Sequence, residues 1–257
     1  MELHQGWHGV WLIVASFIAG TLNAVAGGGS FLSFPALLGV GVLPIQANAT
    51  NTVALWPGQV TSIAAYFSDL KANYRLLVPV CSAALVGGLA GAIVLLRTGQ
   101  ATFMALVPWL LLFATVLFAV SAPISRWLQR RGDRGSEERP LLTPLVLGLV
   151  VVSFYIGYFG AGAGFLIMSV LALFGIQQIN EVNALKVVAT TVANGIAVVT
   201  FIVEGQVEWR YCLLMMITAA AGGFLGARYS RNLHPRVLRV AVVFIGLGMA
   251  IYFFLHK

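Results

Sequence analysis

The chain has 257 residues, of which 60% are hydrophobic and 9% are charged, and its formal net charge is +7. Soluble globular domains carry about 25% charged residues, so this composition excludes a soluble enzyme, a nucleic-acid binder and a disordered chain as first interpretations. Apolar runs of about 20 residues recur along the whole length and predict an all-α polytopic membrane protein with about eight or nine crossings. The excess of basic residues is expected in cytoplasmic loops.

Apolar segments follow one another in the same order twice. The first series is 8–26, a short piece 30–40, then 45–68, 74–96 and 101–122, and the second is 141–159, a short piece 164–175, then 182–204, 210–229 and 236–255. An Arg-rich hydrophilic stretch separates the two series. This order predicts a first transmembrane repeat at 1–123, a cytoplasmic linker at 124–140 and a second transmembrane repeat at 141–257.

A shift of 135 residues aligns the two series. It places the segment 87–91 on 222–226, Arg75 on Arg210 and Asn48 on Asn183. With one residue less of shift, the glycine clusters 27–29 and 160–164 overlap. These matches predict an internal duplication, which is common in secondary transporters and places the substrate site between the repeats. An inverted relation puts more basic residues on the cytoplasmic side than a parallel one does, so we expect inverted repeats.

Each predicted repeat contains a glycine-broken helix followed by a short half-helix. Glycine weakens a helix by about 1 kcal/mol relative to alanine. Inside a membrane, backbone freed in this way persists only against protein or a water-filled cavity. The half-helix after each break directs free N–H groups back toward it, so two facing breaks would form an anion site near the midplane. Close helix packing is the alternative interpretation for the clusters 27–29 and 160–164. For 87–91 and 222–226, whose spacing stays helical, close helix packing is the preferred interpretation.

The candidate substrate-binding residues come from the breaks and from the polar segments that follow the half-helices. They are Asn23, Gly27, Gly28, Gly29, Ser30, Asn48, Thr50 and Asn51 in the first series, and Gly160, Gly162, Gly164, Asn183 and Lys186 in the second. Asn and Thr side chains also cap helices, which leaves a structural role open for several of them. Lys186 is the best candidate for a cation facing a cavity, and snorkelling to the lipid headgroups is its alternative.

No Asp or Glu occupies the centre of a predicted span, which favours an anion over a cation as substrate. Cys81 and Cys212 have no Cys or His neighbour at metal-ligand spacing, so neither a metal nor a cofactor is predicted. Ser30 as a hydrolase nucleophile would need a nearby base, and no histidine lies in a predicted span. An intramembrane hydrolase is therefore the least favoured function.

The run Ala19–Phe31, followed by Pro35-Ala36-Leu37 and the segment 48–52, resembles the TauE/SafE sulfite exporter family, also called the toluene sulfonate uptake permease family. The segment 157–166, together with 183–186, looks like the second repeat of that family. The resemblance covers essentially the whole chain. It implies a multi-pass permease of the bacterial or archaeal cytoplasmic membrane for sulfur-containing anions such as sulfite and organosulfonates.

We therefore expect a secondary transporter, not an enzyme, that moves a small sulfur-containing anion by alternating access, with export as the expected direction. Its expected partners are that anion and the lipid bilayer, with no nucleic acid, and a homo-oligomer is compatible with the sequence. An anion channel and a non-transporting membrane scaffold are the alternatives that the sequence leaves open.

Overall fold

The fold is all-helical in the computed structural model of the chain. The structure describes residues 2–26, 28–64, 70, 74–132, 142–174, 176, 178–229 and 235–255, and within these ranges it leaves out the side chains of 2–8, 24–26, 64, 121–132, 179, 226–229 and 235–239. The described residues form ten helices and no strand. The predicted fold class, an all-α polytopic membrane protein, is confirmed.

The helices follow the predicted segments closely. In chain order they are α1 (Glu2–Ala26), α2 (Ser30–Gly39), α3 (Pro44–Ala64), α5 (Tyr74–Arg97), α6 (Gln100–Gly132), α7 (Leu142–Tyr158), α8 (Ala163–Leu173), α9 (Ile179–Val203), α10 (Trp209–Tyr229) and α11 (Pro235–Leu255). Helix α6 continues past the expected start of the linker at 124, because the residues from 124 to 131 include no glycine or proline.

Apolar side chains cover the outside of the bundle as well as its core. Val78, Val151 and Ile217 are each at least 70% exposed, while Leu12, Phe103 and other large apolar side chains are fully buried. In the part of the chain that the structure describes, three helices are long and apolar enough to cross a membrane by length and composition. They are Tyr74–Arg97, Gln100–Val120 and Asn180–Val203, and six shorter apolar helices accompany them.

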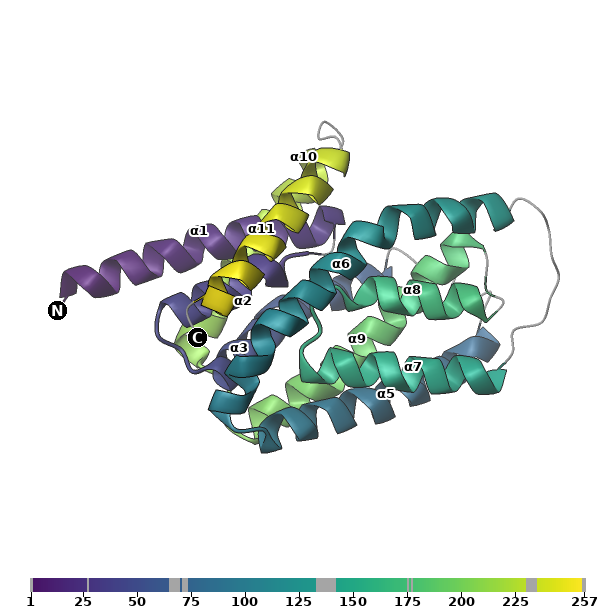
Figure 1. Ribbon diagram of the computed structural model, residues 1–257, viewed down its shortest axis with the longest axis horizontal. Helices are drawn as coiled ribbons and strands as arrows, with labels where there is room; N and C mark the ends of the chain where they lie inside the picture. Colours follow the sequence, from purple (N-terminus) through teal and green to yellow (C-terminus); the bar gives the residue numbers. More distant parts are fainter. Residues whose placement is uncertain are drawn as a thin grey trace.

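The helices pack as two lobes that interleave the two series (Figure 1). The first lobe contains α1, α2, α3, α10 and α11, and the second contains α7, α8, α9, α5 and α6. Helices α6 and α11 pack on each other more extensively than on the rest of their own lobes, so they form the boundary between the lobes. Within the lobes, α1 packs along α10 and α5 packs along α7, and these are the two most extensive helix pairs. Between the lobes, the main contacts join α3 to α9 and α6 to α11. We call the two groups the first-break lobe and the second-break lobe.

Exchanging the two series of helices maps each lobe onto the other. The exchange pairs α1, α2 and α3 with α7, α8 and α9, and it pairs α5 and α6 with α10 and α11. The extensive α5–α7 pair then corresponds to α10–α1, and the α3–α9 and α6–α11 pairs correspond to themselves. This packing agrees with a duplication, and the repeat relation itself stays a prediction.

Small residues let the backbones within each lobe approach closely. A Cβ atom added to Gly87 would lie 2.3 Å from the carbonyl oxygen of Val150, and one added to Gly91 would lie 2.0 Å from that of Phe154. In the other lobe, a Cβ atom on Gly222 would lie 2.0 Å from the carbonyl oxygen of Phe17. Because no real side chain fits at such distances, helix packing explains the glycines at these three positions.

Candidate functional site

Both predicted helix breaks are present. Helix α1 ends at Ala26 and α2 begins at Ser30, while α7 ends at Tyr158 and α8 begins at Ala163. Gly27, a predicted site residue, lies outside the described residues. Each lobe therefore contains one interrupted helix and one half-helix, and the two half-helices belong to different lobes.

The first break is closely packed. A Cβ atom on Gly28 would lie 2.6 Å from Cγ1 of Val242 in α11, and one on Gly29 would lie 2.4 Å from the carbonyl oxygen of Ala19 in α1. Gly29 has ordinary right-handed backbone angles, so its conformation does not demand glycine. The predicted site residue Asn23 lies beside Gly29. Ser30 is the first residue of α2 and is half-buried.

The second break has a different backbone. Gly160 and Gly162 have positive φ angles of 78° and 71°, a region that L side chains rarely adopt. Side chains hold the carbonyl oxygens of this turn. The Tyr155 hydroxyl donates to Ala161 O at 2.8 Å, and the Asn48 amide in α3 donates to Tyr158 O at 3.2 Å. The shape of the second break is therefore fixed from its own helix and from the opposite lobe.

Lys186 in α9 lies across the first turn of α8. Its Cδ atom would be 3.6 Å from a Cβ atom on Gly164, the second residue of that helix. Its ammonium donates a hydrogen bond to Asn183 Oδ1 at 3.1 Å. The first turn of α8 has no acidic residue, and its N-cap Gly162 makes no side-chain hydrogen bond. No carboxylate of the described residues pairs with Lys186.

The electrostatic consequence is a positive potential at this point. The free amides at a helix N-terminus carry a partial positive charge, and the ammonium adds a full one. The apolar helices around them screen charge far less than water does. Gly164, Asn183 and Lys186 therefore lie together, whereas Gly160 lies near Asn194 Oδ1 and Gly162 near Ala114. Whether these residues form the predicted binding site stays a prediction.

The polar residues of α3 are buried and contact other parts of the protein. Thr50 Oγ1 accepts a hydrogen bond from the backbone N–H of Glu208 at 3.0 Å, just before α10. Asn51 Oδ1 accepts one from the Ser33 hydroxyl of α2 at 2.5 Å, and Asn48 holds Tyr158 O as described above. Asn48 and Asn51 therefore support the second break and the half-helix α2, and Thr50 holds the residue that precedes α10. Their position in the sequence did not reveal these partners.

Aromatic rings lie between the two breaks. A Cβ atom on Gly28 would lie 3.5 Å from the ring of Phe118, and one on Gly162 would lie 3.1 Å from the carbonyl oxygen of Ala114. Phe118 and Ala114 are one helical turn apart on α6, so both breaks flank the same turn. The ring of Phe118 also contacts Phe31 of α2 and Phe165 of α8, with centroids 6.1 and 5.2 Å apart. No hydrogen bond joins the described residues of the first break to those of the second.

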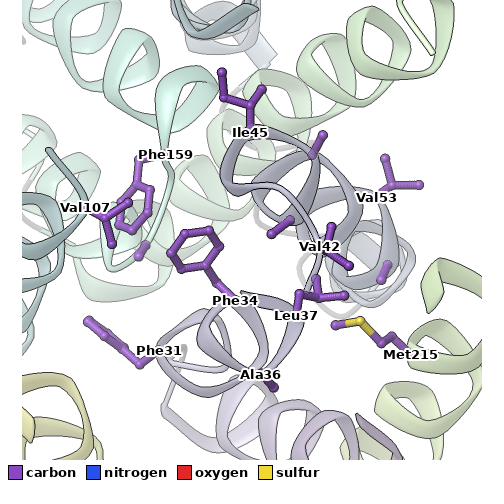
Figure 2. Packing of buried hydrophobic residues seen from close by; sticks show 14 of the residues in the cluster. Phe31, Phe34, Ala36, Leu37, Val42, Ile45, Val53, Val107, Phe159 and Met215 are labelled. Atoms are coloured by element: carbon purple, nitrogen blue, oxygen red, sulfur yellow. The ribbon is translucent and has the colours of Figure 1, made fainter. Parts of the chain in front are cut away.

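A second ring contact crosses between the lobes. Phe34 of α2 points toward Phe159 in the second break, with Val107 of α6 nearby (Figure 2), and the ring centroids of Phe34 and Phe159 are 5.5 Å apart. Sequence reasoning missed this aromatic cluster. The sequence did contain a sign of it, because phenylalanines flank both glycine clusters.

A bundle with an apolar exterior, two interrupted helices and a cation held at a half-helix N-terminus has the features of a membrane transport protein. The model of the sulfite exporter TauE/SafE family matches residues 12–253. The chain therefore belongs to this family, which confirms the resemblance seen in its sequence.

Curated relatives agree over nearly the full length. A probable membrane transporter protein of Sinorhizobium sp, ORF9, is 28% identical over 94% of this chain and 90% of the relative. A probable membrane transporter protein of Haemophilus influenzae is 26% identical over 93% and 91%, and YfcA of Escherichia coli, with the same description, is 26% identical over 93% and 87%. These names specify neither a substrate nor a direction. No solved structure matches the chain.

Proposed function

We propose that the protein is a secondary transporter that exports a small sulfur-containing anion, such as sulfite or an organosulfonate, across the bacterial or archaeal cytoplasmic membrane by alternating access. One observation carries the proposal. The side chain of Lys186 passes Gly164 in the first turn of α8, which follows a left-handed glycine turn, and its ammonium donates a hydrogen bond to the neutral amide of Asn183.

The chemistry of this group suits an oxyanion. Sulfite and sulfonate oxygens accept several hydrogen bonds. The N–H groups of Ala163 and Phe165 already donate to Gly160 O and Gly162 O, so the donors proposed for the anion are the Gly164 N–H, the ammonium of Lys186 and the NH₂ of Asn183. An ammonium about 4 Å from a monoanion contributes about 4 kcal/mol at an effective dielectric constant of about 20. The helix terminus adds about 0.3–1 kcal/mol. Lys186 therefore contributes a larger electrostatic attraction than the helix terminus does.

The substrate class and the direction of transport are supported by the family description, which is that of a sulfite exporter. The absence of a carboxylate partner for Lys186 in the described residues supports an anion over a cation. Asn23 and Ser30, next to the first break, supply polar groups on the other side of the aromatic rings. They are the proposed contacts of the anion when it passes to the first-break lobe.

The test is transport by the purified protein in liposomes, with a panel of sulfite, sulfoacetate, taurine, thiosulfate and sulfate, and with chloride and cation controls. We expect saturable flux of at least one sulfur-containing anion, inhibited by the others in order of affinity. Flux that does not saturate and carries current would favour an anion channel, and the absence of flux with every anion would refute the proposal. Counterflow in vesicles of sorted orientation determines the direction.

A further inference from the structure

The interface between the two lobes has an unusual property. Its main contacts are α3 with α9 and α6 with α11. Each of these pairs joins a helix to its own counterpart in the other series. The two lobes therefore meet at the pseudo-twofold axis that would relate the two series of helices.

Four residues make the hydrogen bonds between α3 and α9. The indole N–H of Trp56 donates to Thr191 O at 3.0 Å, and the amide of Asn194 donates to Gln59 Oε1 at 3.0 Å. The Thr191 hydroxyl completes the set by donating to Gln59 O at 3.4 Å. Trp56 and Thr191 are 135 residues apart, and so are Gln59 and Asn194. This is the shift that places the segment 87–91 on 222–226, so each of the four residues contacts its own counterpart.

Two further side-chain amides of the described residues join the lobes. Gln100 Oε1 of α6 accepts a hydrogen bond from the backbone N–H of Ile45 in α3 at 2.9 Å, and the amide of Asn48 makes the other bond. Asn48 of the first-break lobe donates to Tyr158 O of the second-break lobe. The counterpart of Asn48 is Asn183, and the shift of 134 that aligns the breaks makes Ala24 the counterpart of Tyr158. In this structure Asn183 instead accepts a hydrogen bond from Lys186. Only one of the two equivalent bonds is therefore formed.

We infer that Trp56, Gln59, Thr191 and Asn194 form a pivot on which the two lobes rock, and that the Asn48–Tyr158 bond is a latch that closes in this conformation alone. When the lobes exchange conformations, the residue pairs Trp56/Thr191 and Gln59/Asn194 map onto themselves and stay in contact, while donor and acceptor exchange roles within each pair. The latch maps onto a new bond from Asn183 to Ala24 O. Asn183 then leaves Lys186, so the partner of the ammonium changes between the two states. This inference rests on the proposed transport function.

Cross-linking separates the pivot from the rest of the lobe interface. In a background with Cys81→Ala and Cys212→Ala, one variant carries Gln59→Cys and Asn194→Cys at the pivot, and a second carries Phe34→Cys and Phe159→Cys across the interface away from it. A third, with Gly148→Cys and Val170→Cys, links α7 to α8 within one lobe, where a Cβ atom on Gly148 would lie 2.9 Å from Val170 Cγ1. All three are treated with the same short bifunctional methanethiosulfonate reagent, which forms disulfide links that a reductant cleaves.

We expect the Phe34/Phe159 link to abolish transport and a reductant to restore it, which shows that the variant is folded. The Gln59/Asn194 link and the Gly148/Val170 link should leave transport intact. Loss of transport at the pivot while the control stays active would overturn the pivot. Full transport with Phe34 and Phe159 linked would show that this interface does not open.

A second measurement needs no substrate and so separates this inference from the proposed function. Spin labels replace Val151 of α7 and Ile217 of α10, which are exposed and belong to different lobes, and a control pair replaces Val78 of α5 and Val151 within one lobe. We expect two distances between the lobes and one within the lobe. One of the two inter-lobe distances should match this structure. Asn48→Ala should reduce the population with that distance, because it removes the latch. A single inter-lobe distance would refute the rocking motion, whatever the liposome assay shows.

Discussion

The indole of Trp56 in α3 donates a hydrogen bond to the backbone carbonyl of Thr191 in α9, at a donor–acceptor distance of 3.0 Å. The same indole packs on Gly195, where an added Cβ atom would lie 3.2 Å from the ring. One side chain thus provides both a polar and an apolar contact between the two lobes, which lie against each other at only a few helix pairs.

Replacing Trp56 should therefore separate these two contributions. Trp56→Phe keeps an aromatic ring against Gly195 and loses one hydrogen bond, which costs about 1 kcal/mol of unfolding free energy. Trp56→Ala also loses the packing and costs about 3–5 kcal/mol. Thermal unfolding of the purified variants measures both. Equal stability of the two variants would mean that the ring does not pack as described.

The glycines that bring helices together should tolerate alanine poorly. Gly87→Ala and Gly222→Ala each place a methyl group within 2.3 Å of a backbone oxygen on the neighbouring helix. Such overpacking costs about 1–3 kcal/mol, so both variants should unfold at lower temperature. Gly248→Ala is the matched control, because nothing lies within 4 Å of the added atom. It should be neutral or slightly stabilising, and a loss equal to that at Gly87 would contradict the packing.

Two glycines of the second break should respond in opposite ways. Gly162 has a φ of 71°, so Gly162→Ala forces a left-handed alanine and costs about 1–2 kcal/mol. Gly164 lies within α8, where alanine favours the helix by about 1 kcal/mol. If the anion contacts this turn, the methyl group of Gly164→Ala obstructs it. We expect a more stable protein with a higher KM for transport, and an unchanged KM would remove this turn from the site.

Lys186 should be essential for transport but not for folding. Its loss removes about 4 kcal/mol of attraction for a bound monoanion, which corresponds to about a thousandfold weaker binding. Lys186→Ala should therefore abolish saturable flux while the protein remains folded in detergent, and Lys186→Arg should retain part of it. Arg97→Ala, at the exposed end of α5, serves as the control for a general loss of positive charge. Full flux with Lys186→Ala would exclude the ammonium from the mechanism.

Ser153 should be better replaced by alanine. Its hydroxyl is fully buried and has no hydrogen-bond partner among the described residues. Burying an unsatisfied polar group costs about 1–3 kcal/mol, so Ser153→Ala should be neutral or stabilising. Ser16 is equally buried, but it donates to Leu12 O at 2.5 Å. Ser16→Ala should therefore lower stability by about 1 kcal/mol, and the opposite order in thermal unfolding would contradict both assignments.

The expected site is partly visible in the sequence. Breaks at 27–29 and 160–164 follow from glycine clusters, since neighbouring glycines neither stabilise a helix nor fill space. The sequence also indicates that Gly164 and Lys186 belong to one region. Gly164 begins the half-helix of the second series, and Lys186 lies in the polar segment that follows this half-helix. The role of Asn48 could not be predicted from the sequence. Its partner is a backbone carbonyl 110 residues away, and any residue has such a carbonyl.

The sequence by itself determined the helices, their order and the membrane environment. These follow from apolar run lengths and from local breakers, which act over a few residues along the chain. Only the tertiary structure decided that α10 and α11 join the first-break lobe, that phenyl rings separate the two breaks and that Trp56 contacts Thr191. Such pairings depend on which surfaces fit together in space, and nearly every helix here is apolar enough to pack against several others.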